Sequence, residues 1–286
     1  MKPENRVHGL GLKTDLSWVT LPEQEESALS IEGNAKKSTP FQFQTESWTD
    51  TTLDTWNQKG VERFIRVTGD ASLHLKGNDA NTHLIIRLEK NCHLHITHEL
   101  EGICAASITL IAEDEVQGLV TTEGSTDQEC FMYSRRDSYL HTDSDVKWVQ
   151  ADTGGRLTVV ITKNHLLGNN AEGRITHLYA GTDSNEFDVE MESLHTGENS
   201  YSFIRSRGIL HRSRSTTRGL VRINKPAFSS DGYQKSDVIL LDNDSHAISI
   251  PDLEIHNHDV ACSHGSTISK LDEDKLHYMM TRGIPK

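Results

Sequence analysis

The sequence predicts an all-β protein, and three observations lead to this class. From Arg63 onward, short segments in which apolar and polar residues alternate recur about every ten residues, as expected for half-buried strands. The hydrophobic content is 35% and the aromatic content 6%, while Ser, Thr, Asn, Asp and Gly are abundant, a composition that suits strands and turns better than long helices. The clearest helical pattern is confined to the C-terminal end. Periodicity alone leaves a sandwich, a barrel and a β-solenoid open.

The alternating segments are the predicted strands, and polar turn residues such as 76–79 and 89–91 separate them. The segments are Phe64–Val67, Ser72–Leu75, His83–Leu88, His93–Thr97, Ser107–Ile111, Gly118–Thr121, Val146–Val149, Leu157–Ile161, Arg174–Tyr179, Phe187–Met191, Ser202–Arg205, Gly219–Ile223 and Asp237–Leu241.

The chain divides into three parts. Residues 1–60 are polar and are expected to form an N-terminal extension that docks on the main domain and caps it, with a short helix from about Thr49 to Gly60. Residues 61–268 hold the predicted strands, and residues 269–286 begin a C-terminal helical region. A chain of 286 residues is long enough to bury a sizeable core in this arrangement.

The C-terminal helix has recognisable ends. Asp272 suits the N-cap position, and Gly283 suits the position after the last turn. Between them, Leu276, Met279 and Met280 recur at helical spacing and form one apolar stripe. We expect this stripe to pack against the body of the protein.

Charge and cysteine content restrict the partners. The formal net charge of −13 opposes indiscriminate binding to nucleic acid or anionic membranes, because both are held chiefly by clustered Lys and Arg. The chain has neither an apolar run of the ~20 residues that span a bilayer nor the apolar stretch of a signal peptide. Cys92, Cys104, Cys130 and Cys262 form no CxxC pair, so neither a zinc ribbon nor a disulfide framework is indicated. We expect a cytoplasmic protein without a nucleic-acid or membrane partner.

Cys262 and His264 are the strongest candidates for chemistry. Alternation across Leu253, Ile255 and Val260 predicts extended chain here, and residues two apart in a strand share one face. A thiolate beside an imidazole can bind iron or zinc. The alternative is a small buried cysteine next to a surface histidine, which is the commoner situation in proteins.

The segment around these two residues resembles a known family. Residues 251–267 follow the pattern PxLEIxxxDVxCxHGxT, and the acidic helix after them ends in Arg-Gly-Ile at 282–284, as in the SufB/SufD proteins, the scaffold subunits of SUF iron–sulfur cluster assembly. The resemblance runs from about Trp148 to Ile284. It implies a right-handed parallel β-helix, or β-solenoid, and it implies that Cys262 and His264 bind iron or a transient iron–sulfur cluster.

Two positions make the chain similar to SufD rather than to SufB. SufB-type chains have Glu after the histidine that corresponds to His264, whereas this chain has Gly265. The segment 233–240 resembles the SufB pattern QCDSML, but Ser236 stands where SufB has its sulfur-accepting Cys. A hydroxyl is a weaker nucleophile and a poorer iron ligand than a thiolate. The chain is therefore not expected to play the full SufB role by itself.

Trp148 and Gln150 form a secondary candidate site. They belong to the segment 147–155, which resembles the SufB segment RWTQVETGS, and the resemblance implies that they line an internal path for sulfur and contact the cargo. The alternative is that both side chains pack in a coil with their polar atoms hydrogen-bonded, which is usual for buried Trp and Gln.

Arginines and histidines supply further candidates. Six arginines in under twenty residues suggest an anion or nucleic-acid patch, but neighbouring acidic residues favour a ladder of arginines paired along a β-face. The histidine pairs lack a recognisable third ligand, so solvated surface histidines are the favoured interpretation. The arginines are Arg205, Arg207, Arg212, Arg214, Arg218 and Arg222; the histidine pairs are His93 with His95 and His256 with His258.

The leading hypothesis is a non-catalytic scaffold subunit for iron–sulfur cluster assembly. The resemblance implies a separate ABC-type ATPase of the SufC type and a second SufB/SufD-type subunit, as a homodimer or heterodimer, with no tightly bound cofactor. The chain has no Walker A motif, so ATPase activity is expected on that separate subunit. In the family, helices beyond the Arg-Gly-Ile segment help to bind the ATPase; this chain stops at Lys286, which implies a truncated sequence or a weakened or rerouted ATPase contact.

Two alternatives remain open from the sequence. A β-helical carbohydrate lyase or hydrolase would use acidic residues on successive coils as acid, base or calcium ligands, but no carboxylate pair can be assigned. A SufD-like structural partner would have no ligand chemistry at Cys262 and His264.

Overall fold

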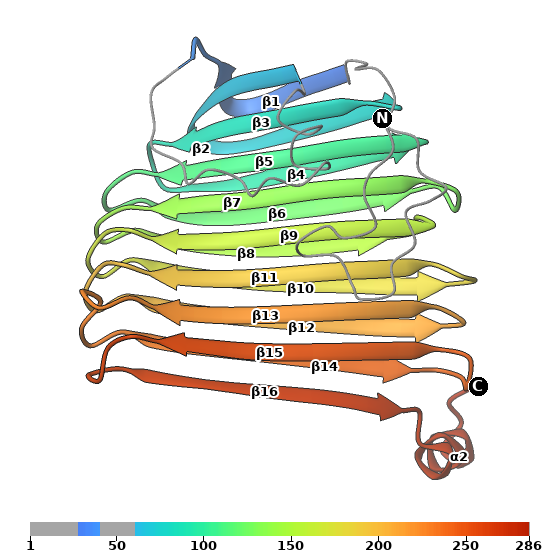
Figure 1. The fold of residues 1–286 in the computed structure, drawn as a ribbon. Coiled ribbons are helices and arrows are strands. Elements are labelled where there is room, and N and C mark those ends of the chain that lie inside the picture. The colour runs from blue at the N-terminus through green and yellow to red at the C-terminus, as the bar shows by residue number, and fades with distance from the viewer. Residues whose placement is uncertain (1–27, 41–60, 286) are drawn as a thin grey trace.

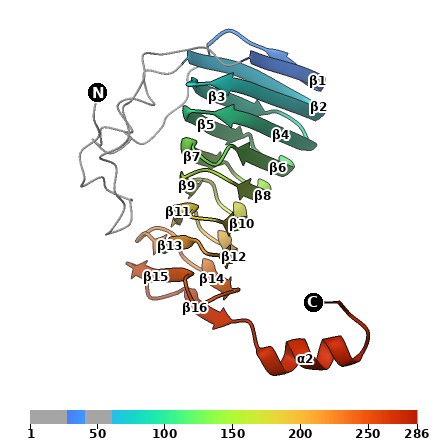
Figure 2. The same cartoon turned by 90° about the vertical axis from the view of Figure 1, so that its right-hand side faces the viewer.

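The computed structural model describes residues 28–40 and 61–285, and it shows a β-solenoid (Figure 1). Sixteen strands form one continuous sheet in which, from β3 onward, each strand pairs in parallel with the strand two places later in the chain. Consecutive strands therefore lie on opposite walls of the coil (Figure 2). The predicted parallel β-solenoid is confirmed. The helix predicted from Thr49 to Gly60 lies outside the described residues.

Each coil contains one strand on either wall. The first wall is formed by β3 Asn81–Leu88, β5 Ile103–Ala112, β7 Phe131–Leu140, β9 Leu157–Leu166, β11 Glu186–His195, β13 Arg214–Ile223 and β15 His246–Ile255. The second wall is formed by β4 Cys92–Glu101, β6 Gln117–Thr126, β8 Asp145–Thr153, β10 Glu172–Thr182, β12 Tyr201–His211, β14 Asp231–Leu240 and β16 Ala261–Lys270.

The N-terminal end of the solenoid is closed by two further strands. β2 Val61–Asn78 pairs through its first half with β3 and through its second half with β4, so it contributes to both walls. β1 Ala28–Lys37 runs antiparallel along β2, with Ala28 opposite Lys76. The sequence pattern did not indicate β1. The predicted cap of residues 1–60 stays a prediction, because most of these residues lie outside the described part of the chain.

Alternation along the strands places apolar side chains inside the coil. Leu73 and Trp148 belong to a cluster that fills the N-terminal half, and Phe187 and Ile204 belong to a second cluster in the C-terminal half. The second wall alternates between buried and exposed residues, as predicted for half-buried strands. On the first wall, β7 is buried along its whole length, so no alternation marks it. Like β1, it is a strand that the alternating pattern does not predict.

One corner of the solenoid repeats with every coil. Glu115, Asp143, Asn170, Asn199 and Ser229 each have a positive φ, between 53° and 62°. Each donates its backbone N–H to a carbonyl of the next coil, at 2.8 to 2.9 Å. The left-handed conformation turns the chain into the next wall, and Asn and Asp tolerate it better than most residues. The corners are therefore stacked by a regular ladder of backbone hydrogen bonds.

The C-terminal helix α2 Glu273–Thr281 has the predicted ends. The Asp272 side chain accepts a hydrogen bond from the N–H of Asp274 at 3.0 Å, and Gly283 follows the helix with a φ of +85°. The expected packing of its apolar stripe is wrong: Met279 and Met280 are 40% and 44% exposed. The helix leaves the edge of the last coil and points away from the solenoid (Figure 2), so no described element covers it. None of the described helices has the length and apolar character of a membrane span.

Candidate functional site

Cys262 and His264 lie on β16, the last strand of the solenoid. Parallel pairing with β14 places Cys262 opposite Gly232 and His264 opposite Gln234, both of which face the interior. Because the two residues are two apart on a regular strand, their side chains share this inner face, as predicted. Cys262 is half-buried against the apolar cluster of the last coils, and His264 is exposed.

The last coil leaves this inner face open. In the described part of the chain no strand follows β15 or β16 in the sheet, so each has one unpaired edge. On β16, residues at inward positions are exposed, including His264 and Ile268, which lie opposite the buried Gln234 and Val238 of β14. An unpaired strand edge presents backbone N–H and C=O groups that can pair with another chain. The candidate ligands therefore lie at a surface suited to association.

The thiol of Cys262 is protonated at neutral pH. Burial raises its pKa to about 11, and the carboxylate of Asp231 adds to the rise. Because the thiolate is the metal-binding form, a metal that binds Cys262 must displace a proton. Among residues 28–40 and 61–285, no three His, Cys, Asp or Glu side chains are placed to hold a metal ion. Most protein metal sites have three or four ligands, so Cys262 and His264 are an incomplete set within this chain.

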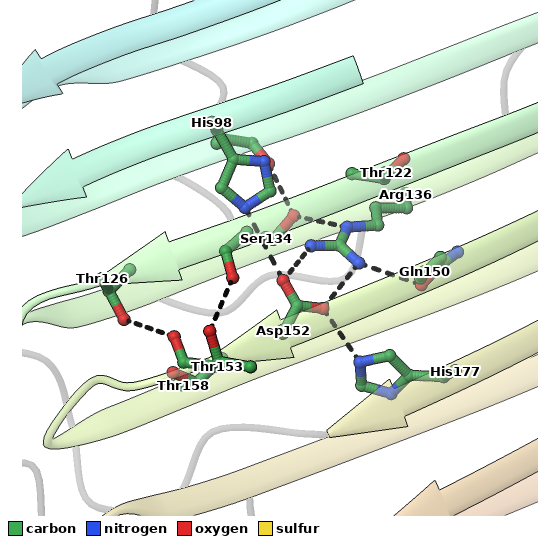
Figure 3. Close-up of polar contacts among 12 residues, drawn as sticks. His98, Thr122, Thr126, Ser134, Arg136, Gln150, Asp152, Thr153, Thr158 and His177 are labelled. Atoms are coloured by element: carbon green, nitrogen blue, oxygen red, sulfur yellow. Dashed lines mark hydrogen bonds and ion pairs between the residues drawn. The ribbon is translucent and has the colours of Figure 1, made fainter. Parts of the chain in front are cut away.

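A second cluster of polar side chains lies inside the solenoid, around Arg136 on β7 (Figure 3). Its guanidinium forms two hydrogen bonds with Asp152 on β8, both at 2.8 Å. It also donates to Ser134 Oγ at 2.9 Å and to Gln150 Oε1 at 3.0 Å. Arg136 and Asp152 are 0% and 1% exposed. Burying an ion pair is costly unless its hydrogen bonds are satisfied, and here the surrounding residues supply them.

Two histidines complete this cluster from neighbouring coils. His177 on β10 donates from Nε2 to Asp152 at 2.8 Å, and His98 on β4 lies 3.6 Å from the other carboxylate oxygen. Burial alone would raise the pKa of Asp152, but Arg136, His177 and His98 outweigh it and hold that pKa well below its usual value. Burial lowers the pKa of His98, against the opposing effect of Asp152. The cluster therefore contains an ionised Asp152 and a neutral His98.

Trp148 and Gln150 take different parts in this interior. The Trp148 indole N–H donates to Thr122 Oγ1 at 2.8 Å, and its ring belongs to the apolar cluster. Gln150 Oε1 accepts hydrogen bonds from Arg136 and from Thr162, each at 3.0 Å. The Gln150 amide nitrogen is buried without a hydrogen-bond partner. Gln150 is thus part of the Arg136 cluster, whereas Trp148 is packed and hydrogen-bonded beside it.

The structure does not bring the two candidate sites together. In the register of the second wall, Trp148 is followed by Ile175, Ile204, Gln234 and His264. Four strand spacings separate Trp148 from His264, which is about 19 Å. The adjacent row runs Gln150, His177, Ser206, Ser236 and Ser266 and is polar throughout. Ser206 and Ser236 are buried, and their hydroxyls have no hydrogen-bond partner.

Sequence reasoning missed the centre of the interior cluster. Arg136 lies in the strand β7, whose sequence does not alternate, and Asp152 lies in the segment 147–155, where the resemblance to SufB indicates Trp148 and Gln150 instead. His98 and His177 each occupy the inward position of an alternating strand. Polar residues at positions where the pattern demands apolar ones were the available signal.

The other sequence candidates are placed as the favoured interpretations predicted, except for two arginines. His93, His256 and His258 are exposed, and His95 hydrogen-bonds Thr121 at 2.8 Å. Four arginines have carboxylate partners. Arg212 pairs with Asp183, Arg218 with Asp188 and Glu190, and Arg222 with Glu254, and Arg207 lies 3.9 Å from Asp237. The exceptions are Arg205 and Arg214, for which no carboxylate partner is found in the described residues.

Comparison with known proteins fits this architecture. The family described as SUF system FeS cluster assembly, SufBD core domain, matches residues 72–286, most of the chain. The chain belongs to the SufBD family. The resemblance seen in residues 251–284 is thereby confirmed, and the match extends it to the N-terminal coils of the solenoid. Membership of the SufBD family also favours the scaffold hypothesis over a carbohydrate-cleaving enzyme.

Individual SufBD relatives align with parts of the chain. An iron–sulfur cluster assembly SufBD family protein of Galdieria sulphuraria is 32% identical over 152 residues, which cover 53% of this chain and 69% of that protein. The corresponding protein of Porphyra purpurea is 29% identical over 196 residues, 65% of this chain and 40% of that protein. A SufBD family protein from Mycobacterium leprae is 24% identical over 206 residues, which cover 72% of this chain and 24% of that protein. This SufBD chain therefore spans less than half the length of the latter two.

Proposed function

We propose that this chain is a non-catalytic scaffold subunit for iron–sulfur cluster assembly that works with a SufC-type ABC ATPase and a second SufB/SufD-type subunit. Membership of the SufBD family supports a role in iron–sulfur cluster assembly. The observation that carries the role of this chain is the position of Cys262 and His264, side by side on the inner face of the last strand and at an open edge of the sheet.

The incomplete ligand set supports a site shared between subunits. Cys262 and His264 offer one sulfur and one nitrogen ligand, and iron or a nascent cluster needs more. The unpaired edges of β15 and β16 supply a surface on which a second subunit can add strands and bring further ligands. In this proposal the cluster or iron is transient cargo, and it is held only when the two subunits meet.

We further propose that the chain takes the SufD-like place beside a SufB-type partner. Ser236, at the position of the SufB cysteine, is buried in the interior row and offers no thiolate. Gly265 follows His264 and adds no carboxylate ligand. A partner with a reactive cysteine would then accept sulfur, while this chain contributes Cys262 and His264 to the shared edge.

The secondary proposal concerns an internal path past Trp148 and Gln150. The polar row from Gln150 to Ser266 supports such a path, because buried hydroxyls without partners line it from one coil to the next. Passage at Gln150 would require Arg136 to move, since its guanidinium hydrogen-bonds both Gln150 and Asp152. Replacing Gln150 with Leu should then lower the sulfide content of the assembled complex while the partners remain bound.

The main test is anaerobic co-purification with a SufC-type ATPase and a SufB-type subunit, followed by analysis of iron and acid-labile sulfide. We expect Cys262→Ala and His264→Ala each to lower the iron and sulfide of the complex at least tenfold, with the subunits still co-purifying. The matched control is His258→Ala, because His258 is an exposed histidine on the loop before β16, outside the strand that carries Cys262 and His264.

Two results would contradict the proposal. Unchanged iron and sulfide in both alanine variants would leave only a structural role for this chain. Failure of the native chain to co-purify with either partner would reject the proposed partners and leave the family assignment as it is.

A further inference from the structure

The outer face of β12 and β14 carries more cations than carboxylates. In the parallel register, Arg205 lies directly opposite Lys235, and Arg207 lies opposite Asp237. Asp237 is 3.6 Å from the Lys235 ammonium and 3.9 Å from Arg207 Nε, both longer than a good hydrogen bond. Three cations thus share one carboxylate, and two of them, Arg205 and Lys235, are direct neighbours whose like charges repel.

The opposite wall of the solenoid shows the usual arrangement. There Lys163 lies 2.8 Å from Glu192, Arg222 lies 2.6 Å from Glu254, and Arg218 pairs with both Asp188 and Glu190. Each of these cations has a close carboxylate. In a chain with a net charge of −13, neighbouring cations that share a single distant carboxylate are suited to bind an external anion.

Arg205 is held in place by aromatic rings. Its guanidinium carbon lies 4.9 Å from the centre of the Phe203 ring, and Phe203 stacks on Tyr233 with the ring centres 5.5 Å apart. The Nε atom of Arg205 is buried and has no hydrogen-bond partner. A guanidinium fixed over a ring keeps its planar set of donors for a carboxylate. Arg205 is therefore pre-oriented, with hydrogen-bonding capacity that the chain does not use.

The surroundings of these cations are partly apolar. Ile209 and Ile239 lie opposite each other in the register and are 48% and 41% exposed. On the neighbouring strand β16, the outward residues Gly265 and Thr267 carry no charge and little bulk. Arginine, aromatic rings and exposed aliphatic residues together are typical of protein interfaces.

We propose that this surface, the β12/β14 patch of Phe203, Arg205, Arg207, Tyr233, Lys235 and the Ile209–Ile239 pair, docks an acidic segment of a partner protein. Carboxylates of that segment pair with Arg205 and Lys235 and relieve their repulsion, and apolar residues of the segment lie on Ile209 and Ile239. Three cations beside one carboxylate on a strongly acidic chain favour a short acidic peptide over a nucleic-acid backbone, which needs many phosphate contacts. The patch lies on the outer face, so this proposal is independent of the ligand role of Cys262 and His264.

The test measures binding of a fluorescent peptide that alternates Glu with Leu to the full chain, by fluorescence anisotropy at low salt. A peptide with Gln in place of Glu and a single-stranded DNA oligonucleotide are measured in parallel. We expect Arg205→Gln and Lys235→Gln each to weaken binding of the Glu peptide about threefold to fivefold, in the range of exposed charge pairs. Asp237→Asn should strengthen binding, because it removes the carboxylate that competes with the peptide.

The matched control is Lys76→Gln. Lys76 lies on the outer face of β2 on the same wall, far along the solenoid, and already has Glu99 at 3.2 Å, so its loss should leave peptide binding unchanged. Thermal unfolding of each variant confirms folding, and surface substitutions should leave the unfolding temperature within a few degrees of that of the native chain.

Equal affinity of all variants, or equal binding of the Glu and Gln peptides, would overturn the proposal. Tighter binding of the oligonucleotide, lost in the same variants, would overturn the acidic partner in favour of nucleic acid.

Discussion

Arg136 and Asp152 form an ion pair with two hydrogen bonds of 2.8 Å in the interior of the solenoid, across the space between its two walls. Arg136 comes from β7 on the first wall and Asp152 from β8 on the second. Ser134, Gln150 and His177 form further hydrogen bonds with the pair. A cross-wall contact of this kind fixes the register of one wall relative to the other, which side-chain ladders within a wall cannot do.

Removing one partner of this ion pair should be costly. Asp152→Asn leaves the Arg136 charge buried without compensation, and we expect it to lower the free energy of unfolding by about 3 to 5 kcal/mol. Replacing both residues, with Arg136→Met and Asp152→Leu, should cost less than the single change, because no unpaired charge remains. Urea unfolding followed by circular dichroism measures both. The control is Asp183→Asn, which breaks the exposed pair with Arg212 and should cost less than ~1 kcal/mol. Similar losses at Asp152 and Asp183 would contradict this account.

The strand that carries Arg136 shows where sequence reasoning stops. Thirteen alternating segments were predicted as strands. Twelve lie within strands of the structure, and the segment Asp237–Leu241 extends one residue past the end of β14 at Leu240. The sequence of β7, FMYSRRDSYL, was passed over because it does not alternate. Both of its faces are buried, so no alternation between core and solvent sets the residue type. Whether a position is polar or apolar depends instead on the side chains that it contacts inside the solenoid. Period-2 patterning reports on half-buried strands only.

The solenoid itself could not be derived from periodicity, although a repeat was present. Left-handed corner residues recur at 115, 143, 170, 199 and 229, each followed by a small or apolar buried residue. The spacing varies from 27 to 30 residues, so no strict repeat is visible, and the residue at the corner changes among Glu, Asp, Asn and Ser. The resemblance around Cys262 and His264 supplied the fold because it did not depend on this pattern.

Stability should fall as the solution becomes acidic, and His195 is one cause. Its ring is buried, with Nδ1 2.8 Å from Ser200 Oγ and Nε2 2.8 Å from Ser202 Oγ. Burial lowers its pKa from 6.5 to about 4, so the folded protein holds the neutral form. The unfolded chain takes up a proton below pH 6.5, and stability is therefore lost as the pH falls from 6.5 towards 4. The expected loss is about 2 kcal/mol at pH 5.

A His195→Gln variant tests this cause separately from other groups. Glutamine can keep hydrogen bonds to the two serines but does not titrate. Urea unfolding at pH 7 and pH 5 gives the loss in free energy of unfolding between these two pH values for the native chain and for the variant. The loss of the variant should be smaller by about 2 kcal/mol. His83, whose pKa burial also lowers to about 4, contributes equally to both chains. Equal losses would show that His195 is protonated in the folded protein.

Cys262 should be the first cysteine to react with an alkylating reagent, although slowly. Cys104 and Cys130 are fully buried and Cys92 is nearly so, whereas Cys262 is half-buried. Its pKa of about 11 leaves little thiolate at pH 8, so the rate should rise steeply as the pH increases to 10. Asp231→Asn removes a negative charge near the thiol and should raise the rate at pH 8 by about 1.5-fold to 5-fold. Mass spectrometry after iodoacetamide treatment gives the rate at each cysteine. Faster labelling of Cys92, or a rate independent of pH between 8 and 10, would contradict the placement of Cys262.

Asn170 should stabilise its corner of the solenoid in two separable ways. It has a φ of 58°, and its side-chain amide donates to Asp143 Oδ1 of the preceding corner at 2.7 Å. Asn170→Gly keeps the favoured left-handed conformation and loses only the hydrogen bond, which at an exposed site is worth up to about 1 kcal/mol. Asn170→Ala loses the hydrogen bond and also forces a Cβ-bearing residue without a compensating polar group into the left-handed region, at a further cost of about 1 kcal/mol. Urea unfolding should therefore rank the chains native, Gly, Ala in order of decreasing stability. If the Asn170→Ala variant were at least as stable as the Asn170→Gly variant, the corner would be free to leave the left-handed conformation. The ladder of backbone hydrogen bonds from Glu115 to Ser229 would then not be what stacks the coils.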